Sequence, residues 1–365
     1  MAEATPAITR HEHIRYGKTW SYLAAGPENG PLMIFIHGWP GIAETWKPQI
    51  TAFAALGFRC IAPDMPGYGQ STPKNKEKTD YSLQNIIDHL LMFLKHGLQR
   101  DEAIWVGHDW GAGVVWALVA HSPEMCLGVV NMSVPYRTLE MGLNELVKYA
   151  NRDIYPEDEF PHAQWSYQAF YETSDENYEK AISFFDKNVE RFLKAVYSKP
   201  HDVKESRDKP AFTANVVKDG GWFGGAEEPP DVPLEATLLS EDLLASLVKA
   251  FKEGGFWAPT AYYLNHEANL KWCEDWSINE GLVNVPCLFV ECLNDTVVAT
   301  HNTKIMDPMK AYCRKLTTVS IDAGHWVALE KPEETNAAIL RWIARELPEG
   351  RAWPFGKKNP LKTKE

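Results

Sequence analysis

The stretch Val106-Gly107-His108-Asp109-Trp110-Gly111 decides the fold class of this chain. It follows the apolar run 103–106, which is typical of a buried strand, and precedes the segment 112–120, which is typical of a buried helix. A strand, a tight Gly-x-Asp-x-Gly turn and a helix form the layout of a nucleophile elbow. The pattern therefore predicts that Asp109 presents its carboxylate at the end of a strand.

Asp109 stands where such an elbow usually carries serine. A carboxylate does not open an ester as serine does. It attacks a tetrahedral carbon and becomes an ester itself. This one residue moves the prediction away from an esterase and toward an enzyme that opens an epoxide or displaces a halide.

Strand and helix patterns alternate on both sides of the elbow, and this alternation predicts an α/β fold with a mostly parallel central sheet covered by helices on both faces. Strands are predicted at 32–36, 58–62, 103–106, 127–132, 285–290 and 316–321, and helices at 46–56, 81–94, 112–120 and 332–347.

The alternation stops between 136 and 276, where the chain is rich in aromatic and charged residues. Helices are predicted there at 183–196 and 240–251, separated by a Gly- and Pro-rich passage at 219–233 that is long for an ordinary connection. We therefore expect residues 1–135 and 277–365 to form the core domain and residues 136–276 to form an inserted helical cap. The tail from 348 to 365 is expected to lie on the surface.

Composition narrows the class of protein. A net charge of −12 argues against a nucleic-acid partner and against an anionic membrane surface. The N-terminal residues lack an apolar signal core, and no run reaches the roughly 18 apolar residues of a membrane span. We expect a cytoplasmic protein without membrane insertion. The six cysteines lack zinc or disulfide spacing, and no metal-ligand cluster or phosphate-binding glycine loop is present, so we expect buried thiols, no metal and no cofactor.

Two late motifs complete the chemistry of the elbow. Asp295 closes the segment 291–295 after one predicted strand, and His325 lies in the segment 322–326 after the last one. Functional groups gather at the carboxyl ends of strands in such sheets, so Asp109, Asp295 and His325 should converge. Nucleophile, acid and then histidine is also the chain order of this arrangement. We expect His325 to activate water against the ester and Asp295 to orient its imidazole.

An ester intermediate that is attacked by water needs donors for its oxyanion. The backbone N–H of Trp110, directly after the nucleophile, is one candidate, and that of Trp39 in the turn 37–40 is the other. A lone Asp before a helix or a lone His in a loop is usually structural, but three such residues in the right order are far more specific. His108 is expected to be structural, because its side chain should point away from that of Asp109.

At these residues the chain resembles the epoxide hydrolases of the α/β-hydrolase superfamily, in the branch that has an aspartate nucleophile and a cap domain. The resemblance runs from about residue 14 to 347, and it rests on the H-G-x-P turn 37–40, the G-x-D-x-G elbow 107–111 and the G-H-W stretch 324–326. It implies an α/β-hydrolase fold, and it implies that His37, Pro40 and Trp326 line the substrate pocket.

Epoxide hydrolases of this kind use two cap tyrosines to bind the ring oxygen. The segment 165–171 resembles the first tyrosine segment, with Tyr167 in the key place, and the segment 255–265 resembles the second, with Tyr263 as the donor. A departing alkoxide needs such donors because it is a poor leaving group. The resemblance therefore implies an epoxide hydrolase that forms a glycol ester on Asp109 and releases a vicinal diol.

Two alternatives stay open. A haloalkane or haloacid dehalogenase would use the same nucleophile, and the indoles of Trp110 and of Trp39, which stands where phenylalanine is common, could bind halide. A non-catalytic binding protein on this fold is disfavoured because the whole triad is present. The expected partner is a small-molecule epoxide in an apolar pocket, and the sequence leaves a monomer and a homodimer open.

Overall fold

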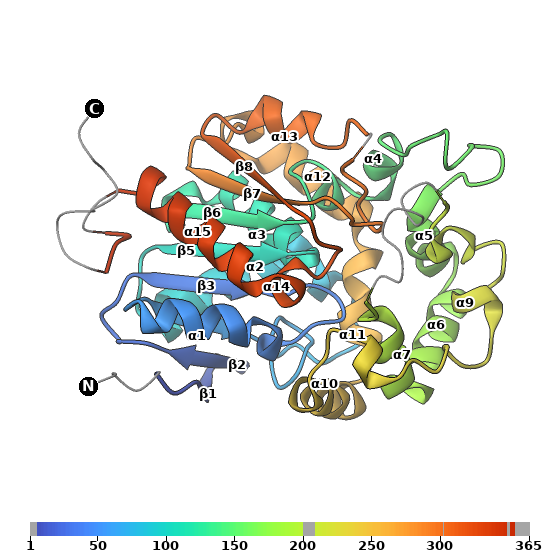
Figure 1. Ribbon diagram of the computed structural model, residues 1–365, viewed down its shortest axis with the longest axis horizontal. Helices are drawn as coiled ribbons and strands as arrows, with labels where there is room; N and C mark the ends of the chain where they lie inside the picture. The colour runs from blue at the N-terminus through green and yellow to red at the C-terminus, as the bar shows by residue number, and fades with distance from the viewer. Residues whose placement is uncertain (1–5, 200–208, 302, 349–350, 355–365) are drawn as a thin grey trace.

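A computed structural model describes residues 6–199, 209–301, 303–348 and 351–354 (Figure 1). Eight strands form one sheet in the order β1-β2-β4-β3-β5-β6-β7-β8. The pairs β1–β2 and β2–β4 are antiparallel. All other neighbours are parallel, and this parallel part is what the alternating pattern predicts. The strands are β1 (Thr9–Arg15), β2 (Lys18–Ala25), β3 (Leu32–Ile36), β4 (Arg59–Pro63), β5 (Ala103–His108), β6 (Cys126–Met132), β7 (Cys287–Cys292) and β8 (Leu316–Ile321).

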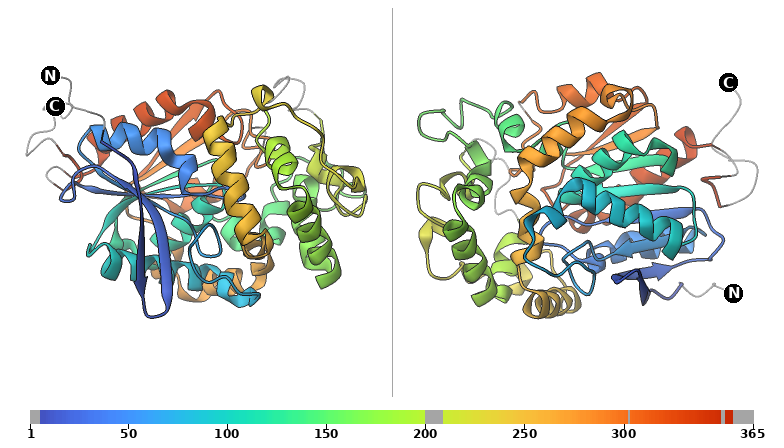
Figure 2. Two further views of the ribbon diagram at one scale, coloured as in Figure 1. Left: turned by 90° about the horizontal axis from the view of Figure 1, so that it is seen from below. Right: turned by 180° about the vertical axis from the view of Figure 1, so that it is seen from behind.

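Helices cover both faces of the sheet, which confirms the predicted layers. Figure 1 shows α1, α14 and α15 in front of the strands, and the view from behind in Figure 2 shows α2 and α3 on the other face. Strands β3, β5 and β6 are buried along their whole length, as expected for strands covered on both sides. These core helices are α1 (Lys47–Ala55), α2 (Leu83–Met92), α3 (Trp110–His121), α13 (Asp307–Tyr312), α14 (Val327–Glu330) and α15 (Pro332–Glu346).

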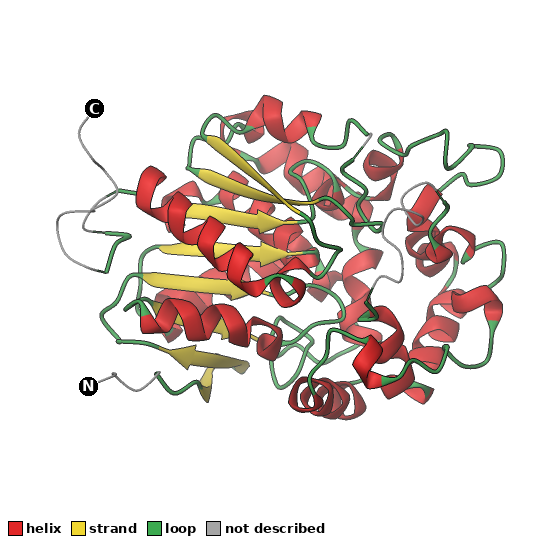
Figure 3. Ribbon diagram, viewed as in Figure 1, coloured by secondary structure: helices red, strands yellow, loops and turns green. Residues whose placement is uncertain are grey.

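A helical segment is inserted between β6 and β7. Figure 3 shows it as helices and loops beside the carboxyl ends of the central strands. Its side chains share one continuous apolar core with α2 and α3. Its α-helices are α4 (Leu143–Val147), α5 (Ser166–Thr173), α6 (Asp175–Lys187), α7 (Val189–Val196), α9 (Trp222–Gly225), α10 (Glu241–Gly254), α11 (Trp257–Thr260) and α12 (His266–Trp276).

Local chemistry explains where several of these helices begin and end. The Ser240 hydroxyl caps α10 by accepting the N–H of Leu243 at 3.2 Å, and Gly255 ends that helix with a positive φ of 69°. The single helix predicted at 183–196 is wrong, because Asn188 interrupts it with φ −122° and ψ 29°. The apolar pattern continues across the break since α6 and α7 both face the same core.

Two further features correct or complete the predictions. The antiparallel hairpin of β1 and β2 was not expected, because β1 is almost entirely exposed and lacks apolar alternation. In the described part of the tail, Ala352 and Trp353 are buried in the same apolar cluster as α1 and α15 instead of lying on the surface. Residues 355–365 of the predicted surface tail lie outside the described residues. All six cysteines are buried and free, as predicted. Among the described residues no helix has the length and apolarity needed to cross a bilayer.

Candidate active site

The sharp turn after β5 places Asp109 at the start of α3 in a strained conformation, with φ 55° and ψ −124°. Two glycines permit this turn. A Cβ on Gly111 would lie 2.1 Å from the Ile36 carbonyl oxygen, and one on Gly107 would lie 2.4 Å from the Gly111 oxygen. Only glycine therefore allows helix α3 to approach strand β3 closely enough to form the elbow.

The two carboxylate oxygens of Asp109 have different surroundings. Oδ1 accepts the backbone N–H of Trp39 at 2.7 Å, while Oδ2 lies 3.5 Å from Nε2 of His325. Gly38 makes the first contact feasible, because a Cβ there would lie 2.3 Å from Oδ1. Oδ1 is thus held by a backbone N–H donor, while Oδ2 faces the imidazole of His325.

His325 and Asp295 meet because β7 and β8 are parallel neighbours whose carboxyl ends lie side by side. Nδ1 of His325 lies 2.8 Å from Oδ2 of Asp295. The other oxygen of Asp295 accepts the N–H groups of Val297 at 2.8 Å and Val298 at 3.1 Å. A fully paired carboxylate of this kind fixes the imidazole with Nδ1–H toward Asp295 and Nε2 toward Asp109.

This pairing shifts the pKa values of both His325 and Asp295. Burial alone would lower the pKa of His325, but the charge of Asp295 and hydrogen bonds with both carboxylates raise that pKa to about 10. Burial would raise the pKa of Asp295, but the charge and hydrogen bond of His325 and two backbone N–H groups lower it. At neutral pH His325 is therefore an imidazolium that lies between two carboxylates.

His108 and Ser133 both contact the backbone of His325. Its Nε2 lies 2.7 Å from the backbone oxygen of His325, and the hydroxyl of Ser133 donates to the same oxygen at 3.1 Å. Burial, and then the charge of His325, lower the pKa of His108 to about 4, so its ring is neutral and donates through Nε2. The His108 ring also lies 4.8 Å from the His325 ring and 5.2 Å from Trp326, and its structural role stays a prediction.

The inserted segment contributes two tyrosines above Asp109. Tyr167 comes from α5 and Tyr263 from the 3-10 turn η9 (Ala261–Leu264), and their ring centroids lie 5.5 Å apart at an interplanar angle of 80°. Both side chains are buried, and burial raises the pKa of each phenol above its usual value. Both phenols are therefore protonated at neutral pH and line one cavity with Asp109 and His325.

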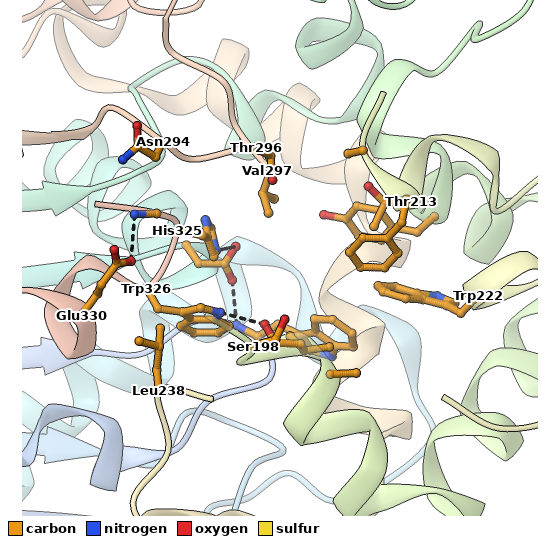
Figure 4. A pocket seen from close by; sticks show the side chains of 18 of the residues that line it. Ser198, Thr213, Trp222, Leu238, Asn294, Thr296, Val297, His325, Trp326 and Glu330 are labelled. Atoms are coloured by element: carbon orange, nitrogen blue, oxygen red, sulfur yellow. Dashed lines mark hydrogen bonds and ion pairs between the residues drawn. The ribbon is translucent and has the colours of Figure 1, made fainter. Parts of the chain in front are cut away.

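This cavity has a volume of about 520 Å³. Figure 4 shows that it extends to both sides of His325, with Thr213 and Trp222 on one side and Asn294 and Glu330 on the other. The aromatic lining consists of Trp39, Tyr167, Phe212, Trp222, Tyr263 and Trp326. Such a lining suits an apolar small molecule with a few polar contacts near the reacting atoms.

Three residues were expected to line the pocket, and the structure brings only Trp326 to it. The His37 ring is turned into the core, where Nε2 accepts the N–H of Met65 at 3.0 Å. Pro40 meets the inserted segment through its carbonyl oxygen, which accepts the hydroxyl of Tyr197 at 3.1 Å. The placement of His37 and Pro40 in the pocket is thus corrected, because the turn 37–40 faces the cavity with Trp39 alone.

The two indoles near the nucleophile are positioned differently. Trp39 donates through Nε1 to the hydroxyl of Thr260 at 3.1 Å, so this N–H is already used. The Trp110 ring packs edge-on against Tyr263 at 5.1 Å, and its buried Nε1 has no hydrogen-bond partner among the described residues. The side chain of Trp110 does not line the cavity, whereas its backbone N–H opens α3 directly after Asp109.

Sequence reasoning missed Gln168, whose buried amide donates to the Tyr167 hydroxyl at 3.2 Å. Neighbouring positions on a helix do not normally face each other, so the sequence carries no signal for this contact. Among the described residues no group of three or more His, Cys, Asp or Glu side chains is arranged to hold a metal ion.

Comparison with known proteins agrees with this architecture. Residues 31–332 match the family described as alpha/beta hydrolase fold. An epoxide hydrolase of Neurospora crassa is 26% identical over 346 residues, which cover 90% of this chain and 93% of that protein. The structure of a mutant Vigna radiata epoxide hydrolase is 25% identical with a TM-score of 0.72, covering 92% of this chain and 98% of the other.

The bifunctional epoxide hydrolase 2 of Sus scrofa is 28% identical over 316 residues, which cover 86% of this chain and 52% of that protein. This chain therefore matches only about half the length of such bifunctional relatives. The extent of the family match, together with the sheet order and the elbow, shows that the chain belongs to the α/β-hydrolase fold family.

Proposed function

We propose that this protein hydrolyses epoxides to vicinal diols, with residues 136–276 acting as a cap that supplies the donors for the ring oxygen. The observation that carries the proposal is that Tyr167 and Tyr263 line the same cavity as the carboxylate of Asp109. The names of the relatives, which are epoxide hydrolases, support the same reaction class.

In the first half-reaction Oδ2 of Asp109 attacks an epoxide carbon, and the carbon–oxygen bond breaks toward the ring oxygen. Oδ1 continues to accept the hydrogen bond from the backbone N–H of Trp39. The ring oxygen takes the electron pair together with a proton from one cap tyrosine, which becomes a tyrosinate. The product is a glycol ester of Asp109.

In the second half-reaction His325 removes a proton from water, and the resulting hydroxide adds to Cγ of Asp109. The N–H of Trp39, with that of Trp110 as the proposed second donor, stabilises the oxyanion. The ester bond then breaks, and the departing diol oxygen takes the proton from His325. The remaining water proton, carried by the re-formed carboxyl of Asp109, restores the tyrosine, so that the sum is epoxide plus water to diol.

The effect of the Asp109 charge on the pKa of His325 is consistent with ester formation preceding ester hydrolysis. The pKa of His325 is raised partly by Asp109. Once Asp109 is an uncharged ester, this contribution disappears, and His325 releases the proton that it carries in the free protein to solvent; it takes one back from solvent when the charge of Asp109 returns at the end of the cycle. The base therefore becomes competent only after the ester has formed.

The same nucleophile could serve a dehalogenase, but the indoles do not favour it. Halide release needs N–H donors at the leaving group. Trp39 donates to Thr260, and the Trp110 ring packs against Tyr263 outside the cavity lining. The phenol pair is a better match for an oxygen leaving group than for a halide.

The test is turnover of an aryl epoxide such as styrene oxide, followed by measurement of the diol. We expect diol from the wild type and none from Asp109→Ala. We also expect Tyr167→Phe plus Tyr263→Phe to lower the rate of ester formation by about 10²- to 10⁴-fold. Bromide release from a simple bromoalkane that survives the double Tyr→Phe change, with no diol from the epoxide, would contradict the proposal.

A further inference from the structure

Gln168 makes a buried contact with one of the two proposed donors and does not itself reach the cavity. Its side chain is 1% exposed, and Nε2 donates to the Tyr167 hydroxyl at 3.2 Å. Gln168 is absent from the cavity lining, whereas Tyr167 is part of it. Any effect of this amide on the reaction must therefore pass through Tyr167.

The Gln168 amide has one polar atom that hydrogen-bonds to Tyr167 and one that has no partner. Its other polar atom, Oε1, is buried and has no hydrogen-bond partner among the described residues. A buried polar atom that loses water without a new partner destabilises the fold. The hydrogen bond to Tyr167 is therefore the one side-chain hydrogen bond that Gln168 makes among the described residues.

The contact distinguishes Tyr167 from Tyr263. A phenol oxygen that accepts an N–H keeps its own hydrogen for another acceptor, here toward the cavity. As that hydrogen moves to a ring oxygen, negative charge grows on the phenol oxygen, and the N–H bond to it becomes stronger. In the described part of the chain no equivalent amide donates to Tyr263.

The surroundings of Tyr167 make such support useful. Burial raises the pKa of Tyr167, the charge of Asp109 raises it further, and hydrogen bonds from Gln168 and Tyr263 oppose both. The titratable groups that face this phenol are Asp109, Asp295 and His325 of the core, Tyr263 of η9 and Tyr171 of its own helix.

We propose that Gln168 is a positioning residue that turns the Tyr167 hydroxyl hydrogen toward the cavity and stabilises charge on the phenol oxygen as an epoxide ring opens. This inference rests on the proposed function, since it presumes that Tyr167 binds the ring oxygen. It assigns the larger share of ring opening to Tyr167 and the smaller share to Tyr263.

The first experiment is a double-mutant cycle on the full chain with styrene oxide, in which single-turnover kinetics separate ester formation from ester hydrolysis. Gln168→Met keeps the volume and removes the amide. We expect it to slow ester formation about tenfold and to leave ester hydrolysis unchanged, as loss of a hydrogen bond to a developing charge would. In the Tyr167→Phe background the same change should have no effect.

Gln164→Met is the matched control, because Gln164 is equally buried one helical turn earlier and does not line the cavity. It should leave both steps unchanged. Equal slowing by Gln168→Met with and without Tyr167 would overturn the inference, and so would faster ester formation, which would mean that the amide oxygen holds the phenol hydrogen. If Tyr167→Phe alone is silent while the diol still forms, the proposed tyrosine mechanism itself fails.

Gln168→Glu adds a readout that packing would not produce. A carboxyl group donates to the phenol oxygen only while it is protonated, and once ionised it can only accept the phenol hydrogen. Ester formation in this variant should therefore approach the wild-type rate at low pH and fall as pH rises, relative to the wild-type profile. A profile parallel to that of the wild type would contradict the proposed role.

Discussion

At the scale of single residues, the charge state of His325 depends on its two carboxylate neighbours. Asp109→Ala removes the carboxylate that lies 3.5 Å from Nε2. Because that group helps to raise the pKa of His325 to about 10, its loss should lower the pKa by about one to three units. The imidazole nitrogens, followed by NMR over a pH series in ¹⁵N-histidine-labelled protein, report this directly. An unchanged pKa would show that Asp295 alone sets it and would remove the coupling between ester formation and the base.

At the scale of an element, the elbow depends on the close approach of α3 to β3. Gly111→Ala would place a Cβ 2.1 Å from the Ile36 oxygen. We expect a cost of about 1–3 kcal/mol in the free energy of unfolding, from overpacking. We also expect ester formation to fall by about 10²-fold, because a displacement of about 1 Å at the nucleophile has that effect.

Gly113→Ala in the same helix is the matched control. Its Cβ would have no neighbour nearer than 3.6 Å, so the change should leave ester formation intact and add up to about 1 kcal/mol of stability through helix propensity. Thermal unfolding and single-turnover kinetics on both variants decide the point. Equal behaviour of the two alanines would mean that the tight approach does not position Asp109.

For the molecule as a whole, we expect the buried, neutral His89 to lower the stability of the fold in acid. His89 lies in the core with both ring nitrogens unpaired among the described residues, and burial, with the charge of Lys18, lowers its pKa to about 3. His89 stays unprotonated in the folded state, whereas in the unfolded chain it binds a proton below about pH 6.5. The free energy of unfolding therefore decreases as pH falls through that range.

His89→Leu should therefore lose less stability than the wild type between pH 8 and pH 5. The expected difference accumulates at about 1.4 kcal/mol per pH unit below pH 6.5. Urea unfolding at the two pH values measures it. If the two proteins lose equal stability, the His89 ring takes up protons in the folded state and its burial does not govern acid sensitivity.

The sequence predicts those structural features whose signal lies in neighbouring residues, and it misses those that depend on contacts between distant segments. The central strands and their helices follow from apolar periodicity, and Asp109, Asp295 and His325 come together because each follows a strand of one parallel sheet. The break at Asn188 escapes the same reasoning, since periodicity continues through it. The orientation of His37 and the contact between Gln168 and Tyr167 depend on how distant segments pack, which no local pattern encodes.

The covalent role of Asp109 is tested most directly by one turnover in H₂¹⁸O with enzyme in excess over the epoxide. In the proposed reaction the first diol takes its new oxygen from Oδ2 of Asp109, and water replaces that oxygen in the protein. We predict an unlabelled diol and one ¹⁸O atom in the peptide that contains Asp109, both read by mass spectrometry. A labelled diol together with an unlabelled peptide would show that water attacks the epoxide directly, and it would contradict the glycol-ester mechanism.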